Sequence, residues 1–241
     1  MIQEQASIFQ EYSKIYTGLS IQPFFFVLRG KFMTGLIFDV DGTLWDSTEV
    51  VAKSWNAAIE EYTDWDLRVD APLLRKHFGK PMSEIAKAVF PDCSDEERNF
   101  VSAKCMDNQN PFLLRERPDL YPGVADTIIE LSKKYKLFIV SNCHSGYIEA
   151  LLDISGLNSY ITDFTCPPYT GKYKSDNIRL IMERNNISNA HYVGDTVMDM
   201  EACKAAGVPF VFCEYGFGNV DFSDCEYIIK SFDNLRSIDF N

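Results

Sequence analysis

The chain has 241 residues, of which 46% are hydrophobic and 24% charged, and its formal net charge is −12. This composition is typical of a folded globular protein and excludes a mostly disordered chain. The negative charge repels nucleic-acid phosphates and anionic lipids, so neither nucleic acid nor a membrane is an expected partner. The seven cysteines contain no C-x-x-C pair, which favours reduced thiols in a cytoplasmic protein.

The first 32 residues are expected to be a segment appended to the folded domain. They contain the most apolar run in the chain, Phe24-Phe25-Phe26-Val27-Leu28, which is much shorter than the roughly 20 residues of a membrane-spanning helix. No basic region precedes the run and no small-residue cleavage site follows it, which argues against a secretory signal. Met33 is a candidate start of the folded protein.

From residue 34 onward, short apolar runs alternate with amphipathic stretches. We expect strands at about residues 36–38, 137–140, 160–164, 191–193, 208–213 and 227–229. Helical spacing of apolar residues predicts helices that include residues 51–62, 124–135 and 178–185. This alternation predicts an α/β fold of the Rossmann-like kind, with a parallel sheet between two layers of helices.

The interval between Asp46 and Tyr121 departs from this alternation, because it contains helical patterns and no convincing strand. Within it, Ser94 and Glu97 have the spacing of a capping box. We expect an inserted α-helical cap domain at residues 47–120, and a catalytic core at residues 33–46 and 121–241. An insert after the first strand lies at the edge of the sheet where open α/β folds bind ligands, which is the position of a lid.

Two carboxylates follow the first predicted strand, in the sequence Asp39-Val40-Asp41-Gly42. Carboxylates this close repel each other unless a cation or a shared proton lies between them. Oxygen ligands of this kind suit Mg²⁺, and the glycine can leave backbone N–H groups open to an anion. The alternative is an ordinary acidic turn, since Asp and Gly are common turn residues.

Polar side chains also follow two later strands. Asp195 ends the strand before a predicted helix, and Asp199 lies four residues further on, on one face of that helix. The alternative for this pair is a helix cap at Asp195 with a solvated Asp199. Ser141 and Asn142 follow residues 137–140 and could hold a phosphate oxygen, or serve in a turn or cap.

Two lysines, Lys172 and Lys174, precede a predicted helix that Ser175 is expected to cap. A cation beside the positive end of a helix is unfavourable unless an anion binds there. At least one of the two lysines is expected to be an ordinary solvated loop residue.

Taken together, these motifs resemble the haloacid dehalogenase-like superfamily, in the order in which that family carries them. The four matching segments are Asp39-x-Asp41-Gly42-Thr43-Leu44, Ser141-Asn142, Lys172 or Lys174, and Gly194-Asp195-Thr196-x-x-Asp199. Tyr121-Pro122-Gly123-Val124, Ala205-Ala206-Gly207 and the helical insert are similar to the phosphoglycolate-phosphatase branch. The resemblance covers the chain from about residue 34 to the C-terminus.

The resemblance implies a catalytic role for each acid. Asp39 would be the nucleophile that forms an aspartyl-phosphate, and Asp41 the general acid and then the general base. Mg²⁺ would be held by Asp39, the backbone carbonyl of Asp41 and Asp195, with Asp199 in support.

The phosphoryl oxygens would be bound by Ser141, Asn142 and a lysine. The third motif departs from the Lys-Pro-x-Pro of this branch. Lys172 fits that spacing, while Lys174 directly precedes the predicted helix cap. We favour Lys174.

The same resemblance predicts a Mg²⁺-dependent phosphatase of a small phosphomonoester, such as phosphoglycolate or a sugar phosphate. Dehalogenases of the superfamily lack the second acid of the first motif, so the presence of Asp41 favours phosphoryl transfer. A sugar phosphomutase of the β-phosphoglucomutase kind shares every motif and is the alternative enzyme. A non-catalytic phospho-ligand binding protein is the alternative from another class.

The sequence His77-Phe78-Gly79-Lys80-Pro81 interrupts the helical insert and predicts a loop. In family members with this kind of cap the corresponding loop reaches the substrate, so Lys80 would contact the part that is not transferred. The alternative is a surface lysine in an ordinary connection between helices.

Overall fold

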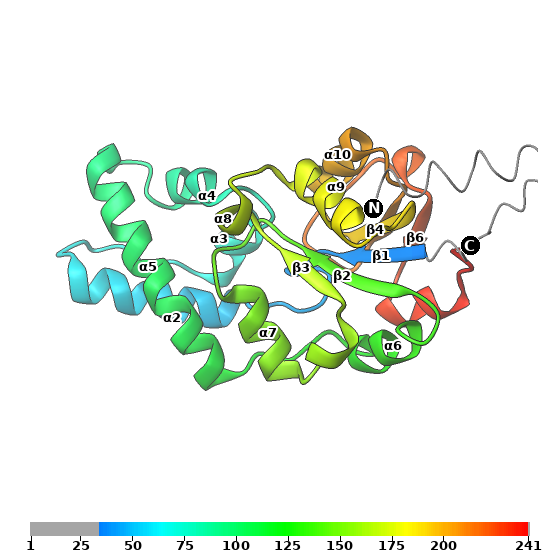
Figure 1. Ribbon diagram of the computed structural model, residues 1–241. Helices are drawn as coiled ribbons and strands as arrows, with labels where there is room; N and C mark the ends of the chain where they lie inside the picture. Colours follow the sequence, from blue (N-terminus) through cyan, green and yellow to red (C-terminus); the bar gives the residue numbers. More distant parts are fainter. Residues whose placement is uncertain (1–33, 241) are drawn as a thin grey trace, which may run out of the picture. The chain divides into compact units, whose positions relative to one another are not determined.

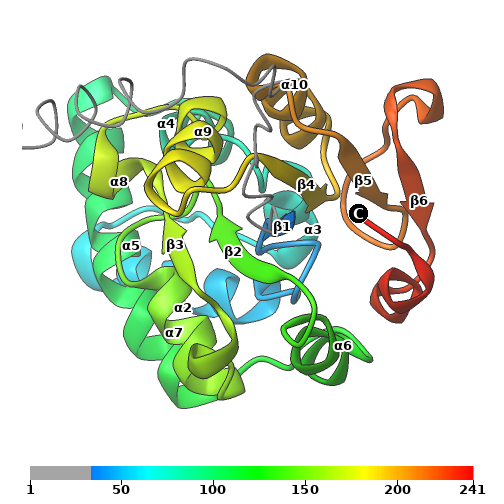
Figure 2. The same cartoon turned by 45° about the vertical axis from the view of Figure 1, so that its right-hand side comes forward.

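A six-stranded parallel sheet forms the centre of the fold in the computed structural model, which describes residues 34–240. The strands are β1 (Thr34–Phe38), β2 (Lys136–Val140), β3 (Asp163–Thr165), β4 (Asn189–Gly194), β5 (Phe210–Cys213) and β6 (Tyr227–Ile229). Their order is β3-β2-β1-β4-β5-β6 (Figure 2). The predicted parallel α/β fold is therefore confirmed. The expectations for residues 1–32 and for Met33 lie outside the described residues.

The central strand β1 is apolar on both faces because both faces are covered. Leu36 and Phe38 belong to one hydrophobic cluster, and Ile37, between them, belongs to the other. Alternate side chains of a strand point to opposite faces, so the continuous apolar run is what a strand between two helical layers requires.

One face of the sheet is covered by α6 (Val124–Leu131), α7 (Tyr147–Ser155) and the 3₁₀ helix η3 (Phe232–Ser237), whose apolar residues share the cluster of Phe38. The other face is covered by α9 (Lys174–Arg184) and α10 (Val197–Ala206), which pack with Ile37 (Figure 2). Shorter elements connect these layers: η1 (Asn158–Tyr160), α8 (Pro167–Thr170) and η2 (Phe222–Asp224).

A helical insert follows β1. It consists of α2 (Thr48–Tyr62), α3 (Ala71–Arg75), α4 (Met82–Val89) and α5 (Asp95–Glu116). These helices lie beyond the carboxyl ends of the strands (Figure 1). Their own core includes Trp55 stacked on Phe90, with ring centroids 6.1 Å apart. The predicted capping box of Ser94 and Glu97 is confirmed at the start of α5.

Three details differ from the sequence expectations. Residues 158–160 form a 3₁₀ turn, so the third strand begins only at Asp163. The helix predicted over 124–135 ends at Leu131. Ser175 does not cap α9, because that helix already begins at Lys174 and its N-cap residue is Tyr173. None of the helices in the described part of the chain has the length and apolarity needed to cross a bilayer.

Candidate active site

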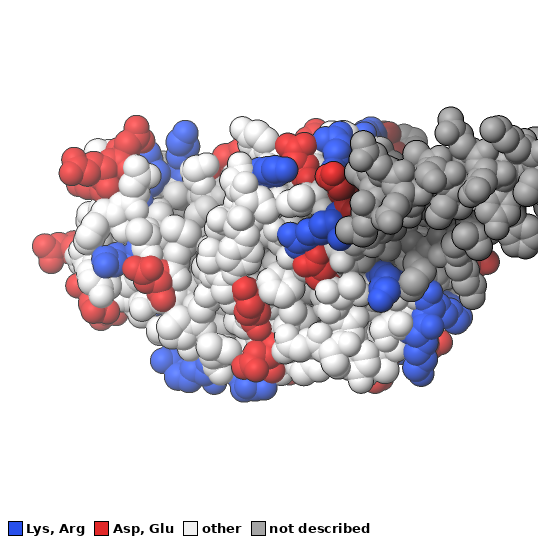
Figure 3. Space-filling model, viewed as in Figure 1, with Lys and Arg blue, Asp and Glu red and all other residues white. Residues whose placement is uncertain are grey.

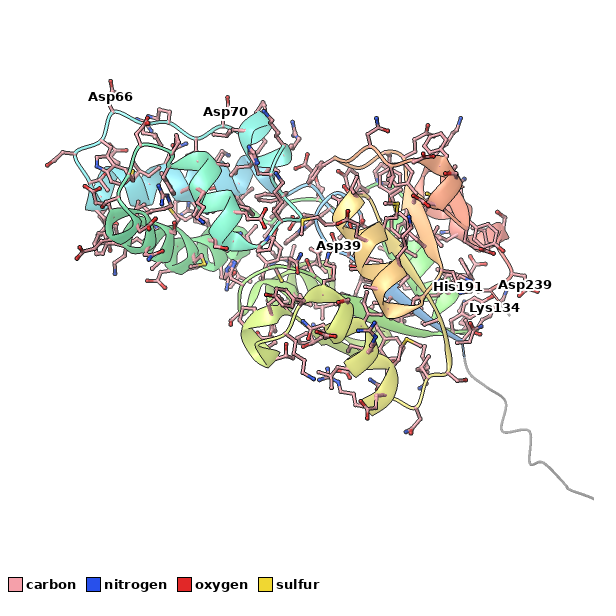
Figure 4. The ribbon with its side chains drawn as sticks, turned by 90° about the horizontal axis from the view of Figure 1, so that it is seen from above. Asp39, Asp66, Asp70, Lys134, His191 and Asp239 are labelled. Carbon is pink, nitrogen blue, oxygen red and sulfur yellow. The ribbon has the colours of Figure 1, made fainter. Side chains whose placement is uncertain are left out.

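The candidate site lies where the chain reverses its direction of winding across the sheet. From β1 the chain proceeds outward to β2 and β3, and it then returns to β4 on the other side of β1. Asp39 follows β1 and Asp195 follows β4. Their adjacent strands therefore create the crevice at which open α/β sheets bind ligands. Figure 4 shows Asp39 between the helical insert and the strands, with His191 at the far end of the sheet.

Three buried carboxylates meet in this crevice. Ligand oxygens of Asp39, Asp195 and Asp199 all lie within 4.8 Å of one another. Lys174 is also buried, and its Nζ lies 2.9 Å from Oδ1 of Asp39 and 2.6 Å from Oδ1 of Asp199. Three carboxylates and one ammonium group give a local charge of −3 + 1 = −2. A divalent cation with a preference for oxygen ligands fits this donor set and this charge.

The pKa values of these groups are shifted by burial and by the neighbouring charges. Burial raises the pKa of Asp39 to about 6, with Lys174 lowering it and Asp199 raising it. Burial and then the carboxylates of Asp199 and Asp39 raise the pKa of Asp195 well above its usual value. Burial would lower the pKa of Lys174, but the neighbouring carboxylates outweigh that effect and raise it. The lysine therefore stays charged and partly compensates the acids.

Asp195 is held by two glycine-containing turns. Gly42 has a φ of 80°, and a Cβ added there would overlap the carboxylate of Asp195. A Cβ added at Gly216 would overlap the same side chain. The backbone N–H of Phe217 donates to Oδ2 of Asp195 at 2.7 Å, and Thr43 Oγ1 donates to Oδ1 at 3.4 Å. The absence of side chains at these glycines lets the backbone approach the acid closely.

Asp199 is fixed by the start of α10. Thr196 is the N-cap residue, and its backbone N–H and Oγ1 both donate to Oδ2 of Asp199, at 3.0 and 2.6 Å. This capping box leaves Oδ1 of Asp199 for Lys174 and for the hydroxyl of Tyr192, at 3.3 Å. The alternative of a helix cap at Asp195 with a solvated Asp199 is therefore wrong, because Thr196 caps the helix and Asp199 is buried.

Asp41 is also buried, but its carboxylate has different partners. Its Oδ1 accepts hydrogen bonds from Trp45 Nε1 at 3.1 Å, Ser47 Oγ at 3.0 Å and the Tyr147 hydroxyl at 2.6 Å. Burial raises the pKa of Asp41 to about 7, while the hydrogen bond from Tyr147 lowers it and the charge of Asp39 raises it. This carboxyl group can therefore be protonated or ionised near neutral pH. The metal-ligand role predicted for Asp41 rests on its backbone carbonyl and stays a prediction.

The two polar residues after β2 have different partners, one an acid of the site and the other the helical insert. Ser141 is buried and donates a hydrogen bond to Asp39, which lowers the pKa of that acid. The side-chain amide of Asn142 instead donates to the backbone carbonyl of Gly79, at 2.8 Å. Asn142 is thus occupied in joining the sheet to the insert, and this contact differs from the predicted contact with phosphate.

The structure separates the three lysines singled out in the sequence. Of the two that precede α9, Lys174 reaches the acids and Lys172 is exposed to solvent. Lys80 lies in the loop between α3 and α4 and lines the same cleft as Asp39 and Asp41, with its Nζ 3.4 Å from Nδ1 of His77. We call this space the Asp39 cleft. Its volume is about 30 Å³ and its walls also include Trp55, Phe78, Met82, Gln109, Ser141, His144 and Tyr147.

Several residues of the site carry no signal in the local sequence. Tyr147 contacts Asp41 from a position 106 residues later in the chain, and Phe217 reaches Asp195 from the loop after β5. Ser47 is closer, since it follows Asp41 by six residues in the loop that leaves β1. A serine at this position does not by itself indicate a contact with Asp41, because the contact depends on the path of that loop.

Comparisons with known proteins point to one family. Residues 36–213 match the family described as haloacid dehalogenase-like hydrolase. A phosphoglycolate phosphatase of Shigella boydii is 28% identical over 233 residues, which cover 83% of this chain and 90% of that protein.

Solved structures share the fold. A predicted phosphoglycolate phosphatase from Haemophilus somnus superimposes with a TM-score of 0.74 at 19% identity, covering 84% of this chain and 96% of that one. A predicted phosphatase from Clostridium acetobutylicum gives a TM-score of 0.71 at 23% identity, covering 85% and 97%.

Proposed function

Because the chain belongs to the haloacid dehalogenase-like hydrolase family, we propose that the Asp39 cleft hydrolyses a small phosphate monoester. The observation that carries this proposal is the buried group of Asp39, Asp195, Asp199 and Lys174, with Asp41 beside it. The group combines a candidate nucleophile, a divalent-cation site and a fixed positive charge in one crevice. The phosphatases among the relatives support the same activity.

In the proposed reaction, a carboxylate oxygen of Asp39 attacks the phosphorus atom and forms an aspartyl-phosphate. Lys174 donates to Oδ1 of this acid at 2.9 Å, which leaves Oδ2 as the attacking atom. The charge of Lys174 also favours the ionised form of Asp39 against the effect of burial. Ser141 and Lys174 would bind the phosphoryl oxygens, and the ammonium group would oppose their negative charge.

Asp41 is proposed as the proton donor and acceptor. With a pKa raised to about 7, its carboxyl group is partly protonated at neutral pH and can give its proton to the departing alkoxide. The ionised carboxylate then takes a proton from the water that cleaves the aspartyl-phosphate. This carboxylate accepts hydrogen bonds from Ser47 and Tyr147, whereas Lys174 pairs with the other acids.

We further propose Mg²⁺ as the cofactor, held by Asp39, the backbone carbonyl of Asp41 and Asp195, with Asp199 in support. When bound, the ion would neutralise charge on the phosphoryl oxygens during transfer. Free thiols at all seven cysteines support a location in the cytoplasm.

The helical insert is proposed to act as the cap, at residues 47–120, over a core of residues 33–46 and 121–241. Its loop at Phe78–Lys80 meets the core in two ways. The Gly79 carbonyl accepts from Asn142, and the rings of Phe78 and Phe217 lie 6.4 Å apart. This loop brings Lys80 to the wall of the Asp39 cleft, where it would contact the alcohol portion of the substrate. Phosphoglycolate and sugar phosphates are the candidate substrates.

The test is release of inorganic phosphate from 4-nitrophenyl phosphate, with Mg²⁺ and with EDTA. We expect turnover that requires the metal and that is lost in Asp39→Asn, whose amide is nearly isosteric with the carboxylate. A panel of phosphorylated metabolites then ranks substrates. Conversion of a sugar phosphate into its isomer, without release of phosphate, would indicate the phosphomutase alternative. Binding of phosphate esters with neither reaction would indicate a non-catalytic binding protein.

A further inference from the structure

A second and larger hollow adjoins the Asp39 cleft. Its volume is about 400 Å³, which is within the range of small-molecule binding pockets, whereas the Asp39 cleft has about 30 Å³. Its walls come from α4, α5, the loop after β2 and the segment around α8, and include Pro81, Met82, Met106, Cys143, Pro167 and Pro168. We call it the Met106 groove.

The groove and the cleft are continuous. Met82, Asn142, Cys143 and His144 line both of them. By the same measure of volume the cleft is much the smaller of the two. A substrate whose phosphorus lies at Asp39 has room for the rest of its structure mainly in the groove.

The lining of the groove is apolar, and its polar members are largely occupied. The Asn142 amide donates to the Gly79 carbonyl at 2.8 Å. His144 Nε2 lies 2.9 Å from Oδ1 of Asn110, and burial lowers the pKa of His144 to about 4, so the ring is neutral at pH 7. Lys172 is the charged residue of the lining, and its side chain is exposed.

The surface near the groove carries few charged side chains. On the face shown in Figure 3, the middle, where Figure 1 places α8, consists mainly of side chains other than Lys, Arg, Asp and Glu. Tyr173, at the groove, is 81% exposed. An apolar ligand that enters here would remove this surface from water, which is favourable in proportion to the area covered.

We propose that the Met106 groove binds the alcohol portion of the substrate, and that the preferred substrates are phosphate monoesters of alkyl or aryl alcohols longer than two carbons. The inference rests on the proposed phosphatase activity, and for the leaving alcohol it puts this apolar class in place of the glycolate and sugar candidates named above.

The test is a series of n-alkyl phosphates from ethyl to octyl, with 2-phosphoglycolate as a comparison. The basicity of the leaving alkoxide hardly changes along the series, so the chemical step stays constant while the apolar contact grows. We expect kcat/KM to rise roughly threefold to fourfold for each methylene that enters the groove, and then to level off. Binding of the corresponding n-alkylphosphonates, measured by calorimetry, should show the same slope without turnover.

Three variants examine the groove itself. Met106→Glu places a carboxylate in its wall, and Pro168→Glu does so from an exposed position where the fold tolerates change. Both should reduce the dependence of kcat/KM on alkyl chain length, while turnover of ethyl phosphate stays within about twofold of the wild type. Leu114→Glu is the matched control, because Leu114 belongs to the same helix as Met106, is 44% exposed and lies outside the groove lining. This variant should keep the wild-type increase in kcat/KM with chain length.

The outcomes separate this inference from the proposed function. Turnover without a dependence on chain length, or a higher kcat/KM for 2-phosphoglycolate than for every alkyl ester, overturns the inference and leaves the phosphatase activity in place. Absence of turnover with every ester overturns the proposed function. In that case a chain-length slope in phosphonate binding still supports the groove as an apolar binding site, and a flat series overturns it.

Discussion

Replacement of Lys174 by methionine tests the charge balance of the site. The lysine is 5% exposed, and its ammonium group lies 2.9 Å from Asp39 and 2.6 Å from Asp199. Methionine has a similar length, so the substitution leaves little cavity and removes mainly the charge. Asp39, Asp195 and Asp199 then remain buried with no cation, at a local charge of −3 instead of −2.

The expected loss of stability follows from this charge. Removal of one member of a buried ion pair costs about 3–5 kcal/mol, which corresponds to a fall of roughly 6–20 °C in Tm for a domain of this size. The loss should be largest at pH 7 in EDTA. It should shrink at pH 5, because the pKa values of Asp39 and Asp195 are already raised and these acids can take up protons. Mg²⁺ should stabilise the variant more than the wild type.

The assay is urea unfolding followed by circular dichroism, at both pH values and with EDTA or Mg²⁺. Lys172→Met is the matched control, because Lys172 is exposed two residues away and forms no ion pair with any described residue. Its effect should stay within about 0.5 kcal/mol. Equal effects of the two substitutions, or a loss below about 1 kcal/mol for Lys174→Met in EDTA, would refute the role given to Lys174. Turnover should be lost only in the Lys174 variant.

Four further predictions concern Asp41, the glycine beside Asp195 and the contact of the insert with the core. Asp41→Asn should abolish steady-state turnover. It should let the aspartyl-phosphate accumulate from a radiolabelled 4-nitrophenyl phosphate, whose leaving group departs without a proton, and acid quenching detects this intermediate. Turnover near the wild-type rate would contradict the proton transfer. In EDTA, the contribution of Asp41 to the free energy of unfolding should fall as pH rises from about 4 to about 7, because its pKa rises from 3.8 to about 7 on folding. Urea titrations should therefore show a shallower decrease over this window in Asp41→Asn, and identical profiles would exclude the raised pKa. Gly42→Ala should weaken Mg²⁺ binding and turnover at least tenfold. The new methyl group would overlap the Asp195 carboxylate, and a φ of 80° is unfavourable for alanine. Calorimetry measures the affinity for Mg²⁺ independently of turnover. Asn142→Ala should raise KM severalfold with a smaller change in kcat, because it removes a hydrogen bond that holds the insert against the sheet; an unchanged KM would mean that this contact does not affect substrate binding.

The sequence by itself determined the class of fold and the place of the acids. Short apolar runs such as residues 36–38 and 137–140 favour strands covered on both faces, and their alternation with helical patterns predicts a parallel sheet. Acids directly after the first and fourth of the predicted strands are expected at one edge of the sheet, because parallel strands bring their carboxyl ends together. Local pattern therefore placed Asp39 and Asp195 at one edge of the sheet, and the strand order of the structure made their strands neighbours.

Tertiary structure alone decided which of several similar residues reach the site. Lys172 and Lys174 precede the same helix, but α9 begins at Lys174 and directs it into the crevice while Lys172 stays in solvent. Likewise, Asn142 was a plausible phosphate ligand by sequence, yet the insert brings a backbone carbonyl to its amide. A choice between neighbours one or two residues apart depends on where a helix starts and what packs over it.

The partners of Asp41 were equally beyond the reach of sequence pattern. Tyr147 donates to Asp41 across 106 residues of chain, and no periodicity or spacing links two positions so far apart. The strand pattern determines that Asp41 lies just after the carboxyl end of β1. The packing of α7 against the first loop determines that this carboxylate is buried, receives a tyrosine hydroxyl and has a pKa near 7, because burial and hydrogen bonding are properties of the assembled core and not of the local sequence.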